Sequence, residues 1–232
     1  MGGISTPEKR RETHIMDKDF HQNIVLTALR LMPVSFQSFL ICPTYTLEQL
    51  QIDSDLPDLV DHDNIESDPL CRHDHSYKMQ MQEGKLVWTD GGAIERIVSL
   101  CEDAHDFHAE GKYDLVRYCL GKMTHYRVDS LTFPHLFHGK PWSLYHAKFE
   151  DEMGRFILKH ETEIEGMAFT AYKDISKDCL NTTIAAWPIG EEVVQKYKDG
   201  IKLTDEEMLD IVKICIQGIG DLWTTLMQEL KI

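Results

Sequence analysis

The sequence predicts an all-α protein with a single helical domain, and three observations support this fold class. Apolar residues recur at helical spacing in several segments that end at Gly or Pro. Strict alternation of apolar and polar residues, which is typical of a half-buried strand, is nearly absent. The length of 232 residues suits one domain, which we place at residues 16–232 after a flexible polar lead of residues 1–15.

The first predicted helix covers residues 21–32, and Pro33 stops it. Residues 33–90 carry several prolines among many Asp and Ser, so we expect long loops with short helices there. A long loop region in a compact domain is often functional.

The rest of the chain is predicted to be mainly helical. Three helices are expected in its middle: one from after Gly92 to about Glu110, one over residues 112–128 and one over residues 144–165. After a predicted loop at residues 181–190, Thr204 is expected to cap a last helix. The first turn of that helix is acidic, which is favourable near the positive end of the helix dipole.

Composition excludes several classes of protein. The 39 acidic residues outnumber the 24 Lys and Arg, and a net charge of −15 disfavours specific nucleic-acid binding. The first residues contain no apolar run, and no stretch is long and apolar enough for a transmembrane segment. Six scattered cysteines without a C-x-x-C pair are expected to be reduced thiols, which predicts a cytoplasmic protein.

The most informative feature is a group of histidines and carboxylates in the middle of the chain. His125 and Asp129 lie four residues apart on one predicted helix, and His146 and Glu150 lie four apart on the next. Each pair shares a helix face and aims a nitrogen and an oxygen at one point. His135 stands between the pairs. Zinc accepts this mixture of imidazole and carboxylate ligands, so we predict a zinc site.

The same residues resemble a known family. The segment YCLGKMTHYRVD at residues 118–129 resembles a helix of the bacterial zinc-dependent phospholipases C, although Val128 replaces the glycine before the aspartate. His135 follows six residues after Asp129, as in that family, and HAKFE at residues 146–150 matches its next motif. The single-strand nuclease branch of the superfamily ends this motif with aspartate, so Glu150 favours the phospholipase branch.

Two upstream segments extend the resemblance. LPDL at residues 56–59 is similar to a turn of the family, and DHSY at residues 74–77 is similar to its next histidine segment. The resemblance implies the all-α fold of this family and two or three zinc ions: one held by Asp58, His75, His125 and Asp129, a second by His135, His146 and Glu150, and a third by His21 with Asp129 bridging. His73 competes with His75 in this assignment, and Asp61 competes with Asp58.

The family completes its third zinc site with a new N-terminal amine produced by processing. No secretory signal precedes His21 here. Either a chain that begins at Met16 supplies the amine, or a carboxylate of Asp17 or Asp19 replaces it. We favour Asp19, because D-x-H brings two ligands to one site without processing.

The resemblance implies a zinc-dependent phosphoric-ester hydrolase whose partner is a small phosphoester or a phospholipid head group. Clustered divalent ions suit this reaction, because they bind phosphate oxygens and lower the pKa of a water. Asp58 and Glu150 are the candidates for taking the proton of that water, and we prefer Asp58 as a residue on a turn. Leu59 and Arg72 stand where the family has aromatic residues that enclose choline, so we expect Arg72 to disfavour choline.

Two other functions remain open at this point. The same ligands could hold structural zinc in a non-catalytic protein, although structural sites usually contain cysteine. A phosphohydrolase acting on nucleotides or nucleic acid, built around His73 and Asp74, is the other alternative. The remaining histidines fit no ligand position and are expected to be ordinary surface or core residues: His14, His62, His105, His108, His138 and His160.

Overall fold

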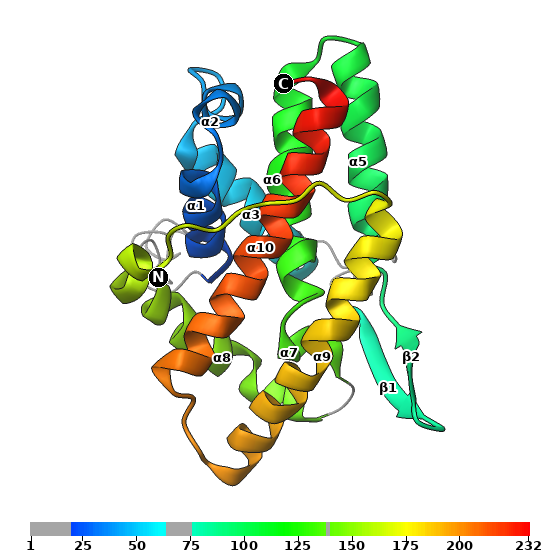
Figure 1. Ribbon diagram of the computed structural model, residues 1–232, viewed down its shortest axis with the longest axis vertical. Helices are drawn as coiled ribbons and strands as arrows, with labels where there is room; N and C mark the ends of the chain where they lie inside the picture. Colours follow the sequence, from blue (N-terminus) through cyan, green and yellow to red (C-terminus); the bar gives the residue numbers. More distant parts are fainter. Residues whose placement is uncertain (1–19, 64–75, 138–139) are drawn as a thin grey trace, which may run out of the picture.

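The computed structural model describes residues 20–63, 76–137 and 140–232, and it confirms the all-α class (Figure 1). The lead of residues 1–15 lies outside the described residues. The elements in chain order are α1 (Phe20–Leu31), α2 (Val34–Leu40), α3 (Leu47–Asp63), β1 (Lys78–Gln82), β2 (Lys85–Asp90), α5 (Ala93–Ala109), α6 (Tyr113–Asp129), α7 (Phe133–Leu136), α8 (Lys140–His160), a 3-10 turn (Glu161–Glu163), α9 (Ile175–Asp199) and α10 (Asp205–Leu230).

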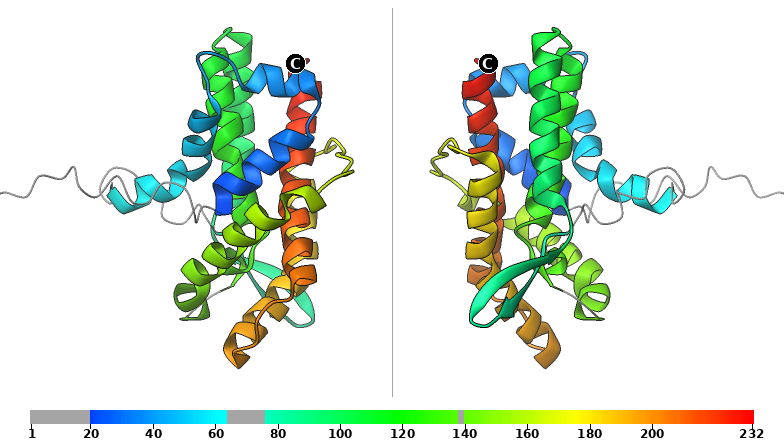
Figure 2. Two further views of the ribbon diagram at one scale, coloured as in Figure 1. Left: turned by 90° about the vertical axis from the view of Figure 1, so that its left-hand side faces the viewer. Right: turned by 90° about the vertical axis from the view of Figure 1, so that its right-hand side faces the viewer.

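Helix α6 is the centre of the arrangement. It packs along α5 and contacts α1, α3 and α10, while α1 also packs against α8 and α10 (Figures 1 and 2). From Thr124 onward, every residue of α6 is buried. The side chains of the last turns of α6 are therefore enclosed by other helices, although several of them are polar or charged.

The predicted start of the last helix is confirmed. The Thr204 hydroxyl accepts a hydrogen bond from the backbone N–H of Glu207, and the Glu207 carboxylate accepts one from the backbone N–H of Thr204. This reciprocal capping box satisfies two backbone donors that have no partner inside the helix. The fully buried indole of Trp223 then fixes α10 to α6 by donating to the carbonyl of Leu120.

The prediction of long loops with short helices over residues 33–90 was wrong in two respects. Residues 47–63 form one helix of 17 residues that continues through Pro57, so the segment resembling a turn at residues 56–59 is helical. Residues 78–90 form an antiparallel hairpin that extends beyond the end of α5 (Figure 1). Its turn is made by Glu83 and Gly84, both of which have positive φ angles, as a tight hairpin requires.

The predicted loop at residues 181–190 was also wrong, because these residues lie in the middle of α9. Pro188 is tolerated there on the exposed side of the helix, while Ala186, Trp187 and Gly190 are buried. Burial of the apolar face against α7 and α5 outweighs the local cost of the proline. The other helices agree with the prediction within a few residues at their ends.

Among the residues that the structure describes, no helix combines the length and the apolar character needed to cross a bilayer. Within the same residues the cysteines are free thiols, and four of them are buried: Cys101, Cys119, Cys179 and Cys215. None of these four lies among the histidines and carboxylates described below.

Candidate metal centre

Six of the predicted ligand residues come together from four helices. They form two groups whose nitrogen and oxygen atoms lie within 4.8 Å of one another, His21 with His125 and Asp129, and His135 with His146 and Glu150. Helix α1 provides His21, α6 provides His125 and Asp129, α7 provides His135, and α8 provides His146 and Glu150. The pair of His125 and Asp129 and the pair of His146 and Glu150 therefore lie in adjoining groups.

The carboxylate of Asp129 is the hub of this arrangement. Its Oδ1 lies 3.4 Å from Nε2 of His21 and 3.3 Å from Nε2 of His135, and its Oδ2 lies 3.1 Å from Nε2 of His125. Three imidazole rings, each from a different helix, thus direct their Nε2 atoms toward one carboxylate. All three N···O distances are ion-pair distances, somewhat longer than the roughly 2.7–2.9 Å of charge-assisted hydrogen bonds.

The carboxylate of Glu150 connects the second group to the first. Its Oε1 lies 2.6 Å from Nε2 of His146 and 3.7 Å from Nε2 of His21. His21 is therefore shared by both carboxylates, and its ring also stacks on that of His125 at a centroid distance of 4.1 Å. The six residues form one continuous cluster.

The solvent exposure of the six residues differs across the cluster. His21, His125, Asp129 and His135 are at most 4% exposed, whereas the side chains of His146 and Glu150 are 24% and 23% exposed. Solvent thus reaches the cluster at the α8 side. A site with buried ligands and an accessible edge can bind an ion and leave one coordination position for water.

Electrostatics keep both carboxylates ionised. Burial by itself opposes the charge of Asp129, but the adjacent His125 and His135 hold its pKa well below the ordinary value. Burial also opposes the charge of Glu150, and hydrogen bonds from His146 and His21 lower its pKa to about 2. Burial and the neighbouring His125 oppose protonation of His21, yet Asp129 and Glu150 raise its pKa.

Contacts behind the cluster fix the orientation of the rings. Nδ1 of His125 lies 3.0 Å from the carbonyl oxygen of Ser54 on α3, which directs Nε2 toward Asp129. The backbone N–H of Tyr77, just before β1, donates to the carbonyl of His135 at 3.1 Å. The contact to Ser54 could not be predicted from the sequence, because it uses a main-chain carbonyl that every residue has.

The two groups overlap the ligand sets that the resemblance implies, but they do not separate its first ion from its third. The group of His135, His146 and Glu150 is the same set that the resemblance assigns to its second ion. The other group joins His125 and Asp129 with His21, which the resemblance assigns to a separate third ion. The shared carboxylate of Asp129 accounts for this, because it brings the ligands of both ions into contact.

Apart from Asp58, the remaining predicted site residues lie outside the described part of the chain. These are Asp19, Arg72 and His75, together with the competing His73. Asp58 lies within α3, one helical turn after Ser54, but its side chain and that of Asp61 are not among those described. Their assignment to zinc stays a prediction.

Three of the histidines that were assigned no ligand role lie at the surface, as expected. Nε2 of His105 pairs with Glu229 at 2.9 Å, and Nδ1 of His160 pairs with Glu163 at 2.8 Å. The ring of His108 packs edge-on against Tyr113. His14 and His138 lie outside the described residues, and the side chain of His62 in α3 is not among those described.

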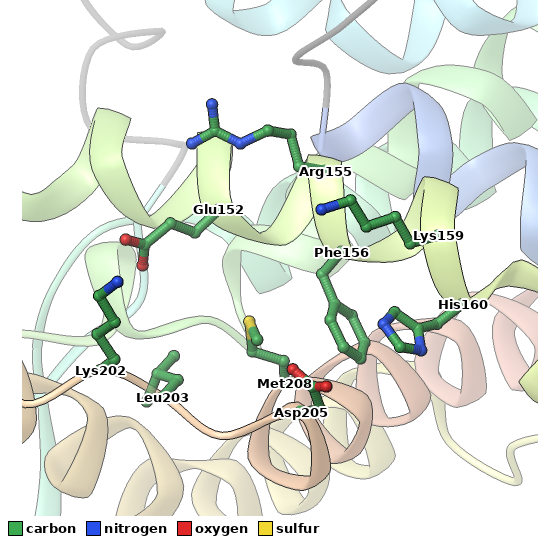
Figure 3. Close-up of a pocket in the computed structure, with 9 residues that line it drawn as sticks. All are labelled: Glu152, Arg155, Phe156, Lys159, His160, Lys202, Leu203, Asp205 and Met208. Carbon is green, nitrogen blue, oxygen red and sulfur yellow. The ribbon is translucent and has the colours of Figure 1, made fainter.

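A separate polar pocket of about 420 Å³ lies along the second half of α8 (Figure 3). Arg155 and Lys159 of α8 and Lys202 before α10 contribute cationic groups to it, while Glu152 and Asp205 contribute carboxylates. None of the six residues of the metal centre lines this pocket. It is therefore distinct from the candidate site.

No protein-family model matches the chain, and no curated protein sequence matches it either. A function for this chain therefore has to be inferred from the geometry and chemistry of its own residues. The buried His, Asp and Glu side chains could hold a metal ion.

Proposed function

We propose that the chain is a zinc-dependent phosphoesterase resembling phospholipase C, which hydrolyses a phosphodiester. The observation that carries this proposal is the single cluster in which Asp129 and Glu150 share His21. Two adjoining ligand groups suit two or three ions, and adjacent divalent ions are typical of enzymes that hydrolyse phosphoesters.

The donor set favours zinc in a catalytic rather than a structural role. The six side chains supply imidazole nitrogens and carboxylate oxygens, which zinc accepts, and none is a cysteine. Structural zinc sites are usually closed by four ligands that include cysteine. Here His146 and Glu150 are partly exposed, so the α8 edge is the side from which a substrate phosphate would approach.

When zinc is bound, it supplies a Lewis acid that polarises a phosphoester and a water molecule. The protein must then hold the ions and remove a proton from that water. Glu150 is poorly placed to take the proton, since its Oε1 is already engaged by His146 at 2.6 Å. We therefore keep Asp58 as the preferred proton acceptor, one turn of α3 beyond the carbonyl that orients His125.

Zinc content and hydrolysis together test this function. The protein reconstituted with zinc should carry at least about two ions per chain, as adjoining ligand groups of this kind imply. It should cleave bis(p-nitrophenyl) phosphate or a phospholipid. His146→Ala should lower hydrolysis at least about 100-fold, because a direct ligand matters more than its supports. His105→Ala is the matched control, since this histidine pairs with Glu229 at the surface.

The outcomes separate the alternatives. Two bound ions without hydrolysis of any phosphodiester would leave a non-catalytic zinc protein. Faster cleavage of nucleotides or single-stranded DNA than of phospholipids would favour the nucleotide or nucleic-acid phosphohydrolase. Fewer than one zinc per chain after reconstitution, or equal content in wild type and His146→Ala, would contradict the metal centre itself.

A further inference from the structure

A buried hydrogen-bonded group lies next to the metal centre, in the interface between α3 and α6 (Figures 1 and 2). Its central residue is Asp53, which is 2% exposed. Oδ2 of Asp53 accepts a hydrogen bond from the hydroxyl of Tyr45 at 2.6 Å, and Oδ1 accepts one from the side-chain amide of Gln49 at 2.9 Å. Burial raises the pKa of Asp53, while these two hydrogen bonds oppose the increase. Both carboxylate oxygens are therefore held in place by donors.

The position of Tyr45 is itself fixed by a tight turn. The backbone N–H of Cys42 donates to the carbonyl of Tyr45 at 2.9 Å, and the N–H of Tyr45 donates to the carbonyl of Cys42 at 3.0 Å. In the same turn, the hydroxyl of Thr44 donates at 2.9 Å to Asp114, which lies in the first turn of α6. The turn is thus attached to α6, and the 3% exposed Tyr45 connects it to α3.

The same group contacts α6 one helical turn before the ligand His125. A Cβ atom at Gly121 would lie 2.7 Å from the hydroxyl of Tyr45 and 3.0 Å from Cβ of Asp53, so the pair lies directly on the backbone of α6. Gly121 and His125 are four residues apart and share one face of the helix. On α3, Ser54 directly follows Asp53. The contact at Gly121 is therefore adjacent to the contact between Ser54 and His125.

The contact with Ser54 determines which ring nitrogen of His125 can bind an ion. The carbonyl oxygen of Ser54 lies 3.0 Å from Nδ1, and both residues are 0% exposed. A carbonyl oxygen can only accept a hydrogen bond, so Nδ1 must carry the hydrogen atom. In a neutral imidazole the lone pair is then on Nε2, which lies 3.1 Å from Oδ2 of Asp129. A displacement of Ser54 would remove this preference.

We propose that Asp53 is a positioning residue of the metal centre, which together with Tyr45 holds α3 against α6 so that Ser54 fixes His125 for metal binding. Asp53 acts through the main chain of Ser54 and not on the ion itself. The proposal rests on the metal centre of the proposed function, but not on the reaction that this centre catalyses. Supporting contacts of this kind typically change metal affinity by about 10–100-fold.

Zinc affinity, measured on the full chain by competition with a chromophoric chelator, tests this role. Asp53→Leu removes the acceptor, whereas Asp53→Asn keeps an oxygen that can accept from Tyr45 and an amide that can pair with Gln49. We expect Asp53→Leu to bind one zinc ion at least about tenfold more weakly than wild type. The other ion, held by the group on α7 and α8, should bind with unchanged affinity. Asp53→Asn should bind both ions as wild type does.

Two more variants separate positioning from a general loss of stability. Thr204→Ala removes the cap of α10, so it should lower the urea midpoint and leave the affinity for both zinc ions unchanged. Tyr45→Phe removes a single hydroxyl group and provides the test if Asp53→Leu does not fold. It should weaken binding of the same ion as Asp53→Leu, but to a smaller extent, because Gln49 still donates to Asp53.

Each other result overturns the proposal. Wild-type affinity in Asp53→Leu or Tyr45→Phe, equal weakening of both ions, or equal losses in Asp53→Leu and Asp53→Asn would show that Asp53 does not position the site. The same loss in Thr204→Ala would show that stability alone controls zinc binding. A wild-type chain that binds no zinc would contradict the metal centre and this proposal with it. Because the readout is binding, a chain that binds zinc but cleaves no phosphodiester would contradict the proposed function alone.

Discussion

Gly121→Ala should destabilise the protein and weaken metal binding, because α3 packs tightly against α6 at this glycine. A Cβ atom there would lie 2.7 Å from the hydroxyl of Tyr45 and 3.0 Å from Cβ of Asp53. Neither neighbour can move freely. Both are buried, and the Tyr45 hydroxyl donates to Asp53 at 2.6 Å. The two helices must therefore separate by a few tenths of an ångström, or this hydrogen bond must break.

The magnitude follows from two opposing effects. Overpacking a buried contact costs about 1–3 kcal/mol, whereas replacing glycine by alanine inside a helix gains about 1 kcal/mol. The expected net loss in the free energy of unfolding is up to about 2 kcal/mol, measured by urea denaturation. Zinc affinity should fall about tenfold, because Ser54, next to Asp53, orients His125.

Gly190→Ala is the matched control in another helix. Its added Cβ would meet Cε2 of the partly exposed Phe137 at 3.0 Å, a ring that can turn aside, and the two other neighbouring atoms are at 3.5 Å. We expect this variant to be as stable as wild type or slightly more stable. If Gly121→Ala matches Gly190→Ala in both stability and zinc affinity, the close approach of α3 does not position the site.

Three further predictions concern other parts of the molecule. Thr204→Ala should lower the free energy of unfolding by about 1 kcal/mol in a urea titration, since it removes the capping box; unchanged stability would mean that the cap contributes nothing. Removing metal with a chelator should lower the melting temperature, and zinc should restore it by binding the folded state; equal melting temperatures with and without zinc would argue against a centre built into the fold. If the chain is the proposed phosphoesterase, phosphatidylglycerol should be cleaved faster than phosphatidylcholine, because Arg72 and Leu59 stand where the family it resembles has aromatic residues; the reverse order in a head-group release assay would contradict this prediction.

Part of the candidate site could be predicted because each of two ligand pairs lies within a single helix. His125 with Asp129, and His146 with Glu150, have the spacing that places two side chains on one helix face, whatever the rest of the chain does. The way in which the pairs meet could not be derived from spacing. It depends on α1 lying between α3 and α8, which places His21 against both carboxylates.

The errors in the predicted fold have identifiable physical causes. In the hairpin, Met79 and Met81 alternate with glutamines before Glu83 and Gly84, but five residues of alternation are too few to stand out from a polar region. In α9, Pro188 lies inside the helix, where a proline is normally unfavourable. The packing of Trp187 and its buried neighbours, which depends on residues far away in the chain, decided the outcome.

The last turns of α6 show why the candidate site depends on burial as well as on spacing. A helix that is buried on all sides is normally apolar, yet this segment carries His125, Arg127 and Asp129, all of them 0% exposed. On one side, the negative charge of Asp129 meets three imidazole rings. On the other side, Arg127 donates hydrogen bonds to hydroxyl and carbonyl groups of neighbouring segments. Burial of a charge is costly unless it is paired, and a cation bound by the cluster would reduce this cost for Asp129. The buried position of this carboxylate is therefore a physical reason to expect a metal ion on this face of the helix.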